Sequence, residues 1–402
     1  MLRFVAPAGA PLELAQILRS ARASLVRSGA KDLLSTSFAA ALNCRYVFTA
    51  SSGRAALALI LRSLARLRPG RNVVALPAYT CYTVPAAIVR AGLRIHPLEI
   101  NPLTLDVASG QLDELPGEGL LSILTSNLFG LLNNTDRIRQ AAQARGGFVI
   151  DDAAQALGAT RNGCPAGTLG DVGFYSFGRG KALAAMEGAV IVTNSEEIAS
   201  AIQRESSDTR PAPASHSVEL FFQMLAYYVL LHPRLYWIPN SLPFLKLGTT
   251  EFDPSFPEFR MPGIVRELLP RLLERLAAMN GVRRANAAAL GTGLKGHPEF
   301  TLLQPGEGVE PNYIRFPLLA RDEATRERAV RLLRHAGIGA GPFYPGAVCD
   351  IPRIAAHAVP ENFHRPAAED TSHRLLTLPT HPYVGENDVR RMIDTLRKVE
   401  AR

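Results

Sequence analysis

Apolar and polar positions alternate in a regular way between about residues 45 and 195, and the pattern predicts strands and helices in turn. Short β-branched runs predict strands, and apolar residues repeated every three or four positions predict helices. The strands are expected at 46–48, 72–76, 121–124, 148–150 and 189–192, and the helices at 54–67, 83–91 and 135–144. This alternation is typical of an α/β fold with a mostly parallel sheet covered on both faces.

The pattern changes after residue 206. A stretch rich in Ser, Pro and Ala (206–217) predicts a loop, and an apolar stretch broken by prolines (220–247) follows it. A long helical pattern then runs from about 263 to 289. From residue 313 onward the pattern predicts a smaller α+β domain, with a strand at 313–318 and helices at 323–336 and 386–399.

Two domains follow from this pattern. We expect a large α/β domain over residues 1–255, with an apolar insertion at about 218–250. The long helix and the small α+β domain would fill residues 256–402.

Composition narrows the class of protein. The chain has 402 residues, 47% hydrophobic and 20% charged, which excludes disorder, collagen and coiled coil as the dominant class. The formal net charge of +8 suits anionic partners such as phosphates, but no dense cluster of Lys and Arg indicates nucleic acid. The four cysteines are scattered, which predicts reduced thiols and no metal site. With no signal peptide and no spanning segment evident, a cytoplasmic protein is expected.

The first candidate site is the turn Thr49-Ala50-Ser51-Ser52-Gly53-Arg54, between a predicted strand and a predicted helix. Ligands of parallel α/β sheets bind beyond the carboxyl ends of the strands. Free backbone N–H groups at a helix N-terminus suit a phosphate. A simple N-cap by Ser51 or Ser52 is the alternative.

The second candidate is the acidic pair Asp151-Asp152, directly after the strand at 148–150. Carboxylates at the mouth of a buried strand are costly unless they are paired or cap a helix. The pair therefore indicates either an N-cap or a carboxylate held against a cation, such as a protonated ring nitrogen.

The third candidate is Lys181, which follows another strand in the segment Gly173-Phe174-Tyr175-Ser176-Phe177-Gly178-Arg179-Gly180-Lys181. A lysine in a desolvated pocket can bond covalently to a carbonyl group. A surface lysine on a loop is the alternative.

Together the three segments fit one cofactor, pyridoxal 5'-phosphate (PLP). PLP needs a lysine for its aldehyde, an acidic partner for its ring nitrogen and an anion-binding turn for its phosphate. We therefore expect PLP as the cofactor, Lys181 and Asp152 as catalytic residues, and no metal.

These segments resemble the DegT/StrS-type family of fold-type I, PLP-dependent nucleotide-sugar aminotransferases, from about Ser35 to Arg397. The similar motifs are Ser52-Gly53-Arg54-Ala55-Ala56-Leu57 (family Ser-Gly-Thr-Ala-Ala-Leu), Asp151 to Gln155 (family Glu-Asp-Ala-Ala-Gln) and Ser176 to Lys181 (family Ser-Phe-x-x-x-Lys).

The resemblance implies a role for each matched residue. Lys181 would bond to the cofactor aldehyde, Asp152 would pair with the ring nitrogen, and Gln155 would lie near the ring hydroxyl. The phosphate would be bound by Ser52, Gly53, Arg54 and Ser176. Arg179 and Tyr344 are expected on the substrate side.

The sequence departs from the family pattern at several positions, including Asn127-Leu128-Phe129-Gly130 for the family's His-Leu-Tyr-Gly, and three of the departures bear directly on the expected cofactor contacts. Arg54 replaces a threonine, and it either adds a contact to the phosphate or fills space. Cys81 stands where the family usually places an aromatic residue on the ring, so Tyr82, or else Tyr79, is expected to stack there instead. Glu258 replaces an asparagine that reaches the neighbouring subunit's phosphate, which puts that contact in doubt.

The resemblance implies transfer of an amino group from an amino acid, glutamate by expectation, to a nucleotide-linked keto sugar in surface polysaccharide or cell-wall biosynthesis. A homodimer with active sites at the subunit interface is expected. The family's dehydratases carry histidine in place of the lysine, so Lys181 favours transamination. Because of Cys81 and Glu258, a PLP-binding homologue with a regulatory or assembly role stays an alternative. A lyase or desulfurase lacks an obvious persulfide-carrying cysteine.

The apolar insertion has two interpretations. Residues 220–233 carry no formal charge, but this run is too short to span a membrane. The pattern favours packing against the core or a partner subunit. The other interpretation is peripheral contact of 220–247 with the inner face of the membrane, through aromatic anchors and for a lipid-linked substrate.

Overall fold

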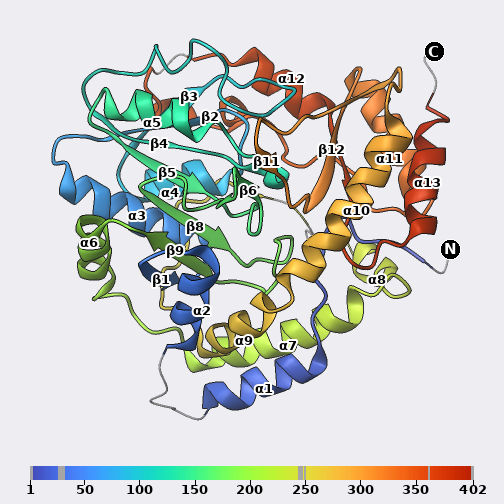
Figure 1. Cartoon of the computed structure of the whole chain (residues 1–402), viewed down its shortest axis with the longest axis horizontal. Helices are drawn as coiled ribbons and strands as arrows, with labels where there is room; N and C mark the ends of the chain where they lie inside the picture. The colour runs from blue at the N-terminus through green and yellow to red at the C-terminus, as the bar shows by residue number, and fades with distance from the viewer. Residues whose placement is uncertain (1–2, 26–31, 243–247, 249, 361–362, 400–402) are drawn as a thin grey trace.

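A seven-stranded sheet forms the centre of the molecule in the computed structural model (Figure 1), which describes residues 3–25, 32–242, 248, 250–360 and 363–399. Its strands lie in the order β1-β9-β8-β5-β4-β2-β3. Their bounds are β1 Tyr46–Ala50, β2 Val73–Pro77, β3 Arg94–Leu98, β4 Leu120–Leu124, β5 Phe148–Asp152, β8 Val172–Ser176 and β9 Ala189–Thr193.

The sheet is mostly parallel, which confirms the predicted fold class. The five strands from β8 to β3 are parallel to one another, whereas β9 is antiparallel to both β8 and β1. The expected strands all form. β3 lies outside the predicted set because His96 and Pro97 interrupt its apolar run. It is an edge strand, where proline is tolerated.

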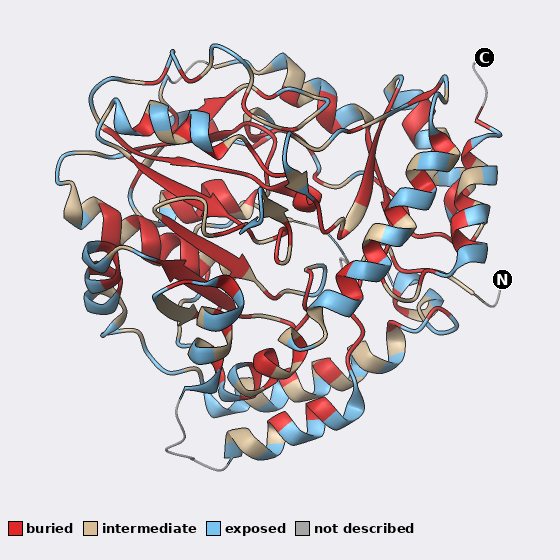
Figure 2. Ribbon diagram, viewed as in Figure 1, coloured by how far each residue is buried: buried red, intermediate tan, exposed pale blue. Residues whose placement is uncertain are grey.

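Helices cover both faces of this sheet. One face packs on α3, α4 and α6, through side chains such as Leu76 and Ile191. The other face packs on α5 near β4 and β5, and on α2 and α9 near β9. Buried residues therefore concentrate in the sheet and on the inner sides of the helices (Figure 2). The bounds are α1 Leu14–Leu25, α2 Leu33–Leu42, α3 Gly53–Leu67, α4 Thr83–Arg90, α5 Thr135–Gln143, α6 Glu196–Ser206 and α9 Gly263–Leu273.

The apolar insertion forms two helices, α7 (Ala214–Leu230) and α8 (Trp237–Asn240). On one side of α7, Leu220 and Met224 are buried in the core beside α1 and α9. Residues 243–247 and 249 of the predicted insertion lie outside the described residues. Among the described residues, no helix combines the length and apolar character needed to cross a membrane.

The single long helix expected at 263–289 is wrong, because the structure has two. α9 ends at Leu273 and α10 runs over Leu276–Leu294. Pro270 lies inside α9, and a proline cannot donate the helical N–H···O bond to the preceding turn. The apolar pattern continues across the break, so periodicity alone does not show it.

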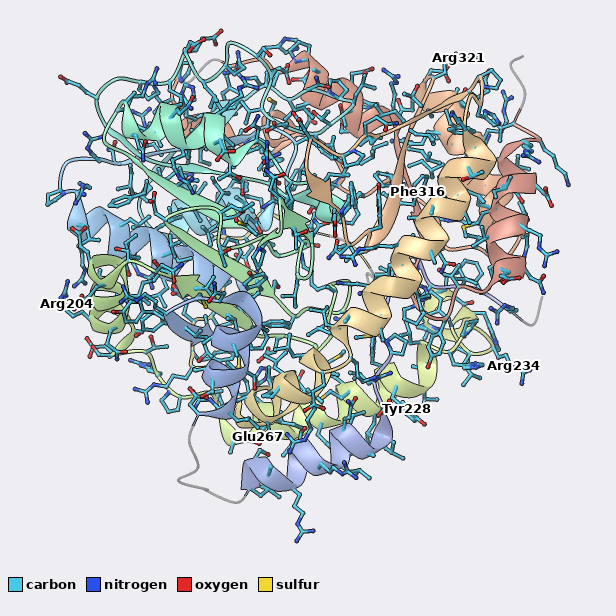
Figure 3. The ribbon with its side chains drawn as sticks, viewed as in Figure 1. Arg204, Tyr228, Arg234, Glu267, Phe316 and Arg321 are labelled. Atoms are coloured by element: carbon cyan, nitrogen blue, oxygen red, sulfur yellow. The ribbon has the colours of Figure 1, made fainter. Side chains whose placement is uncertain are left out.

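The C-terminal part is built on a three-stranded sheet in the order β10-β12-β13. Phe316 of β12 lies under α10 (Figure 3), in a core shared with α11 and α13. A small sheet of β11, β6 and β7 lies near the central one. The remaining bounds are β6 Thr160–Arg161, β7 Cys164–Pro165, α10 Leu276–Leu294, β10 Phe300–Leu302, β11 Val309–Glu310, β12 Arg315–Ala320, α11 Glu323–His335, α12 Pro366–Arg374, β13 Leu375–Pro379 and α13 Glu386–Leu396.

Candidate active site

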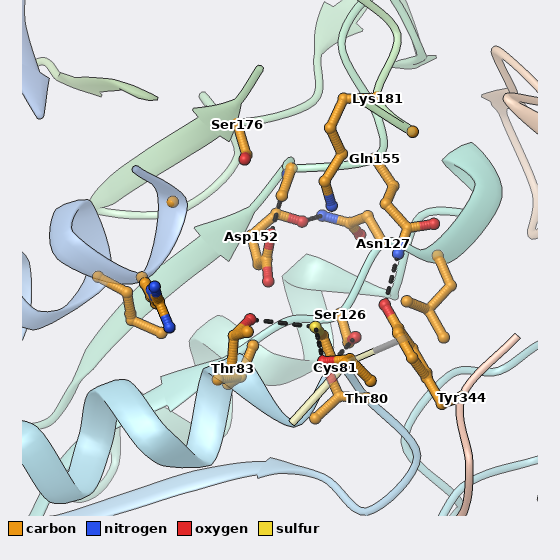
Figure 4. A pocket seen from close by; sticks show the side chains of 18 of the residues that line it. Thr80, Cys81, Thr83, Ser126, Asn127, Asp152, Gln155, Ser176, Lys181 and Tyr344 are labelled. Carbon is orange, nitrogen blue, oxygen red and sulfur yellow. Dashed lines mark hydrogen bonds between the residues drawn. The ribbon is translucent and has the colours of Figure 1, made fainter. Parts of the chain in front are cut away.

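A cavity of about 340 Å³ opens where β5 and β8 end and α3 begins (Figure 4). Eight of the residues predicted from the sequence line it together: Ser52, Gly53, Arg54, Asp152, Gln155, Ser176, Lys181 and Tyr344. They come from segments far apart in the chain, and the strand ends bring them to one place, as expected for a parallel sheet.

The turn before α3 is a close-packed anion cradle. The Ser52 side chain caps the helix by accepting a hydrogen bond from the Ala55 N–H at 3.3 Å, so the N-cap interpretation holds. A Cβ atom at Gly53 would lie 3.0 Å from both Cβ and Oγ of Ser176, so a larger residue would fill this space. The first N–H groups of this 15-residue helix have no partner within the helix, and Gly53 and Arg54, which carry them, line the cavity, where the helix dipole favours an anion.

Arg54, which replaces the family's threonine, stands at the start of α3. Its guanidinium lies over the Phe256 ring, 4.8 Å from the ring centroid, and it lines the cavity. No carboxylate among the described residues forms an ion pair with it. A positive charge in this position adds to the attraction of the turn for a phosphate.

Asp152 and Lys181 face one another across the cavity (Figure 4). Asp152 is 8% exposed, and its Oδ1 accepts a hydrogen bond from the Ala154 N–H at 2.9 Å. Burial raises the pKa of Asp152 to about 6, and the nearby Lys181 amine opposes that rise. A buried carboxylate of this kind gains most from a cationic partner.

Asp151, the other member of the acidic pair, has a structural role. It is fully buried, and its two oxygens accept hydrogen bonds from Thr125, from the Asn127 amide and from two backbone N–H groups. These four donors tie β5 to the neighbouring loops.

Gln155 and Tyr344 form a hydrogen-bonded pair on the cavity wall. The Gln155 amide donates to the Tyr344 hydroxyl at 2.7 Å and accepts from the Phe129 N–H at 3.2 Å. Burial raises the pKa of Tyr344 well above its usual value, so its hydroxyl stays protonated and able to donate to a ligand.

The structure does not bring Tyr82 or Tyr79 into this cavity, so the expectation that Tyr82 contacts the cofactor needs correction. The Tyr82 hydroxyl lies beside Asp350 and Gly346 of the C-terminal part, and its ring packs in a hydrophobic core. It is the residue before α4, and Cys81 and Thr83 on either side line the cavity instead. Arg179 also lies elsewhere, on a second cavity beside the first.

Sequence reasoning named Cys81 only as a departure from the family, and it missed Thr83, Thr250 and Arg315 of the site. The Cys81 thiol is within hydrogen-bonding distance of the hydroxyls of Thr83 (3.0 Å) and Thr250 (3.3 Å). Arg315, at the start of β12, also lines the cavity, and its guanidinium lies 4.9 Å from the centroid of the Phe343 ring. The one feature of the sequence that could have indicated Arg315 is its position as a single arginine within the apolar run 313–318.

Glu258 is held within its own subunit. Its carboxylate accepts hydrogen bonds from Arg62 at 2.8 Å and from Arg90 at 3.0 Å. These arginines lower the pKa of Glu258 although its burial opposes them. The side chain therefore joins α3 and α4 to the segment before α9 and is not available to contact a phosphate.

The cavity as a whole fits PLP. It holds one amine, one buried carboxylate and one anion cradle that a Cβ at Gly53 would fill. If bound, PLP would be held by the turn before α3 at its phosphate, by Asp152 at its ring nitrogen and by Lys181 at its aldehyde.

Comparison with known proteins points the same way. The chain is 29% identical over 330 residues to "GDP-4-keto-6-deoxy-D-mannose 3-dehydratase" of Escherichia coli O55:H7, with 77% of each chain covered. It is 27% identical over 367 residues to "dTDP-3-amino-3,4,6-trideoxy-alpha-D-glucose transaminase" of Streptomyces venezuelae, with 90% of this chain and 84% of the relative covered. The solved structure of Helicobacter pylori PseC, an aminotransferase involved in the biosynthesis of pseudoaminic acid, superposes with a TM-score of 0.79 at 16% identity, over 99% of both chains.

Similar solved structures, at 21–23% identity, include PLP-bound forms, and their likeness confirms the predicted fold. The predicted cofactor agrees with the family whose model matches the chain. The sequence matches the family model of DegT/DnrJ/EryC1/StrS aminotransferases over residues 11–225 and 249–397. The chain therefore belongs to the DegT/DnrJ/EryC1/StrS aminotransferase family.

Proposed function

We propose that this protein transfers an amino group from an amino acid to the ketone of a sugar that is joined to a phosphate-containing carrier. The expected amino donor is glutamate. A nucleotide is the carrier implied by the family resemblance, and the proposed setting is the synthesis of surface polysaccharide or cell-wall sugars. The observation that carries the proposal is the cavity in which Lys181, Asp152 and the turn before α3 meet.

Each of these residues has a separate chemical task in the proposal. When bound, PLP supplies an aldehyde that accepts the amino group and a ring that withdraws electrons. Asp152 would keep a proton on the ring nitrogen. Its carboxylate is buried, so its negative charge is stabilised when the ring nitrogen beside it is positively charged. Lys181 would hold the cofactor at rest, and its amine, once released, would take up and return the proton that the transfer moves.

The substrate side is formed by the C-terminal part of the chain. Tyr344 and Arg315 line the cavity from that part, while Lys181 and Asp152 belong to the central sheet and its loops. Arg179 lies two residues before Lys181, on a second cavity, and is proposed to contact the carrier of the sugar.

Lysine at position 181 favours transamination over dehydration, because the dehydratases of the family carry histidine there. This supports an aminotransferase role although one of the reported relatives is named a dehydratase.

The test has two parts. The protein loaded with PLP is mixed first with glutamate and then with a panel of nucleotide-linked keto sugars. A spectral change with glutamate that a keto sugar reverses, with formation of an amino sugar, is the expected result. Cofactor binding without any response to a panel of amino donors would support the regulatory or assembly role instead.

A further inference from the structure

The loop that carries Lys181 has little support of its own. Gly178 and Gly180 precede the lysine, and a Cβ atom at either glycine would meet nothing within 4 Å. The lysine N–H donates to the Gly178 carbonyl at 3.1 Å, within the same turn. Glycines leave the backbone many conformations. The position of the Lys181 amine in the cavity therefore depends on contacts from outside the loop.

Arg283 of α10 provides one such contact, directly after the lysine. Its Nη2 group donates to the Ala182 carbonyl at 2.9 Å and to the Gly9 carbonyl at 3.3 Å, and its Nη1 group donates to Asn280 at 2.6 Å. Ala182 is buried, and a buried carbonyl needs a hydrogen-bond donor. Arg283 therefore fixes the backbone of the residue that follows Lys181.

The burial of Arg283 is not explained by a counter-charge. The residue is 1% exposed, its Nε atom has no hydrogen-bond partner, and no carboxylate among the described residues pairs with it. Burial lowers the pKa of Arg283 to about 10, so the guanidinium is still charged at neutral pH. An uncompensated buried charge costs free energy. A residue that lowers stability in this way indicates a role in the site that it contacts.

Tyr227 of α7 holds the loop on the other side of the lysine. Its hydroxyl donates to the Arg179 carbonyl at 3.2 Å and accepts from the Ala10 N–H at 3.1 Å. Burial raises the pKa of Tyr227, so the hydroxyl stays protonated and able to donate. The apolar insertion, of which α7 is part, therefore reaches the loop of the active site.

The two contacts share one support, the N-terminal segment at Gly9 and Ala10. Arg283 donates to the carbonyl of Gly9, and Tyr227 accepts from the N–H of Ala10. Three parts of the chain that are far apart in sequence are thereby joined to the loop, on both sides of Lys181.

We propose that Arg283 and Tyr227 are positioning residues, which hold the Lys181 loop from both sides so that the lysine amine meets the aldehyde of the cofactor. Neither residue lines the cavity itself, so both act through the backbone of the loop. A displacement of a reacting group by about 1 Å can cost about 100-fold in rate. The inference rests on the proposed function, because that function gives Lys181 the bond to the cofactor.

The test compares two forms of the cofactor. PLP can bond covalently to Lys181, because the amine nitrogen and the aldehyde carbon condense with loss of water. Pyridoxamine 5'-phosphate carries an amine in place of the aldehyde and cannot form this bond. Both forms would use Asp152 and the turn before α3. The ratio of their affinities for the cofactor-free protein, measured by calorimetry, therefore reports the contribution of Lys181.

Two variants remove the contacts one at a time. Arg283→Met is expected to weaken PLP binding about tenfold or more, and Tyr227→Phe about fivefold. In both variants the affinity for pyridoxamine 5'-phosphate should stay within about twofold, because this form does not depend on the lysine.

The chain offers a neighbouring residue as the matched control for each variant. Arg284→Met is the control for the arginine, because Arg284 donates to the carbonyls of Pro311 and Gly158 and not to the Lys181 loop. Tyr228→Phe is the control for the tyrosine, because the Tyr228 hydroxyl, also on α7 (Figure 3), has no hydrogen bond to another described residue. Both controls should leave the ratio of the two affinities unchanged.

Thermal unfolding midpoints show whether each variant is folded. Tyr227→Phe removes a single oxygen atom, so it still tests the inference if Arg283→Met does not fold. Equal losses of affinity for both cofactor forms in a folded variant would overturn the inference, and so would unchanged affinity for PLP. If the unaltered protein binds PLP no more tightly than pyridoxamine 5'-phosphate, the proposed function fails instead, because Lys181 then forms no bond.

Discussion

At the scale of single residues, the two aspartates that end β5 show how burial divides their roles. Asp151 accepts four hydrogen bonds and acts as a structural anchor. Asp152, one residue later on the opposite side of the strand, accepts one backbone hydrogen bond and faces the cavity. Asp152, which accepts fewer hydrogen bonds, is the carboxylate available for catalysis, because its buried charge is stabilised fully only when a cation binds.

The first prediction concerns the stability of the cofactor-free protein with Asp152→Asn. The pKa of Asp152 is raised to about 6 in the folded protein. Between about pH 4 and pH 6, Asp152 is therefore protonated in the folded state and ionised in the unfolded state. Stability due to this group therefore falls as pH rises through that window. We expect Asp152→Asn to raise the free energy of unfolding by about 1–3 kcal/mol at pH 8, and by little at about pH 3.5, below both pKa values.

Urea unfolding of the cofactor-free protein at both pH values measures this difference. The matched control is Asp151→Asn, which should destabilise, since an amide places N–H groups against donors that now reach an acceptor. Equal effects of Asp152→Asn at both pH values would contradict the account of its buried charge.

Glu258 shows how a single departure changes a contact. It forms ion pairs with Arg62 and Arg90, so it joins two helices and does not contact a phosphate.

We expect Glu258→Gln to lower the free energy of unfolding by about 1 kcal/mol at pH 7, a modest value because the ion pairs are partly exposed. The loss should shrink in high salt, measured by urea unfolding at two ionic strengths. The pKa of Glu258 is lowered, so this stability is present above its unfolded pKa and lost as pH falls through the folded value.

At the scale of elements, the start of α3 is the part of the site that the fold constrains most tightly. The strand β1, the cap at Ser52 and the glycine at 53 place the free N–H groups of the helix beside Ser176. Ser52 and Gly53 lie in one continuous turn, which is why the local pattern indicated an anion site there, whereas Ser176 reaches the turn only through the packing of the sheet.

Gly53→Ala tests this device. The added Cβ would lie 3.0 Å from Ser176, so one of the two must shift. We expect the affinity for PLP to fall by about tenfold or more while the fold is retained, as measured by titration of the cofactor-free protein. Gly178→Ala is the matched control, because a Cβ there meets nothing within 4 Å, and its affinity should not change. Equal affinities for the two variants would mean that the turn does not bind the phosphate.

The sequence pattern predicted the elements of the central sheet and the segments at its strand ends, because each is local and continuous. It did not predict Arg315 and Thr250 at the cavity, which lie more than 60 residues after Lys181 and reach it only through the packing of the second half of the chain. It also placed Tyr82 at the cofactor, although the backbone at the start of α4 turns that side chain away and presents Cys81. The pattern did not predict the break between α9 and α10, because apolar residues continue to repeat every three or four positions through it.

At the scale of the whole molecule, the site lies where two parts of the chain meet. The central sheet supplies Lys181 and Asp152, and the C-terminal part supplies Tyr344 and Arg315. A ligand that touches both parts stabilises their arrangement, and any ligand that binds only the folded state raises its stability. The insertion adds a wall that no strand or helix of the central sheet provides.

A homodimer remains a prediction of the family resemblance. We expect sedimentation of the PLP-loaded protein to give a mass of about 87 kDa, twice the 43.5 kDa of one chain. A mass of one chain at micromolar concentration would contradict it. Peripheral contact of the insertion with a membrane is likewise a prediction, and flotation of the protein with anionic vesicles would test it.

The most direct test of the central claim is to find which lysine carries the cofactor. The chain has five lysines, at 31, 181, 246, 295 and 398. The PLP-loaded protein is reduced with borohydride, digested and analysed by mass spectrometry, with Lys181→Ala as the control. The account predicts the cofactor on Lys181 and none in the variant. Covalent cofactor on another lysine, or none in the unaltered protein, would contradict it.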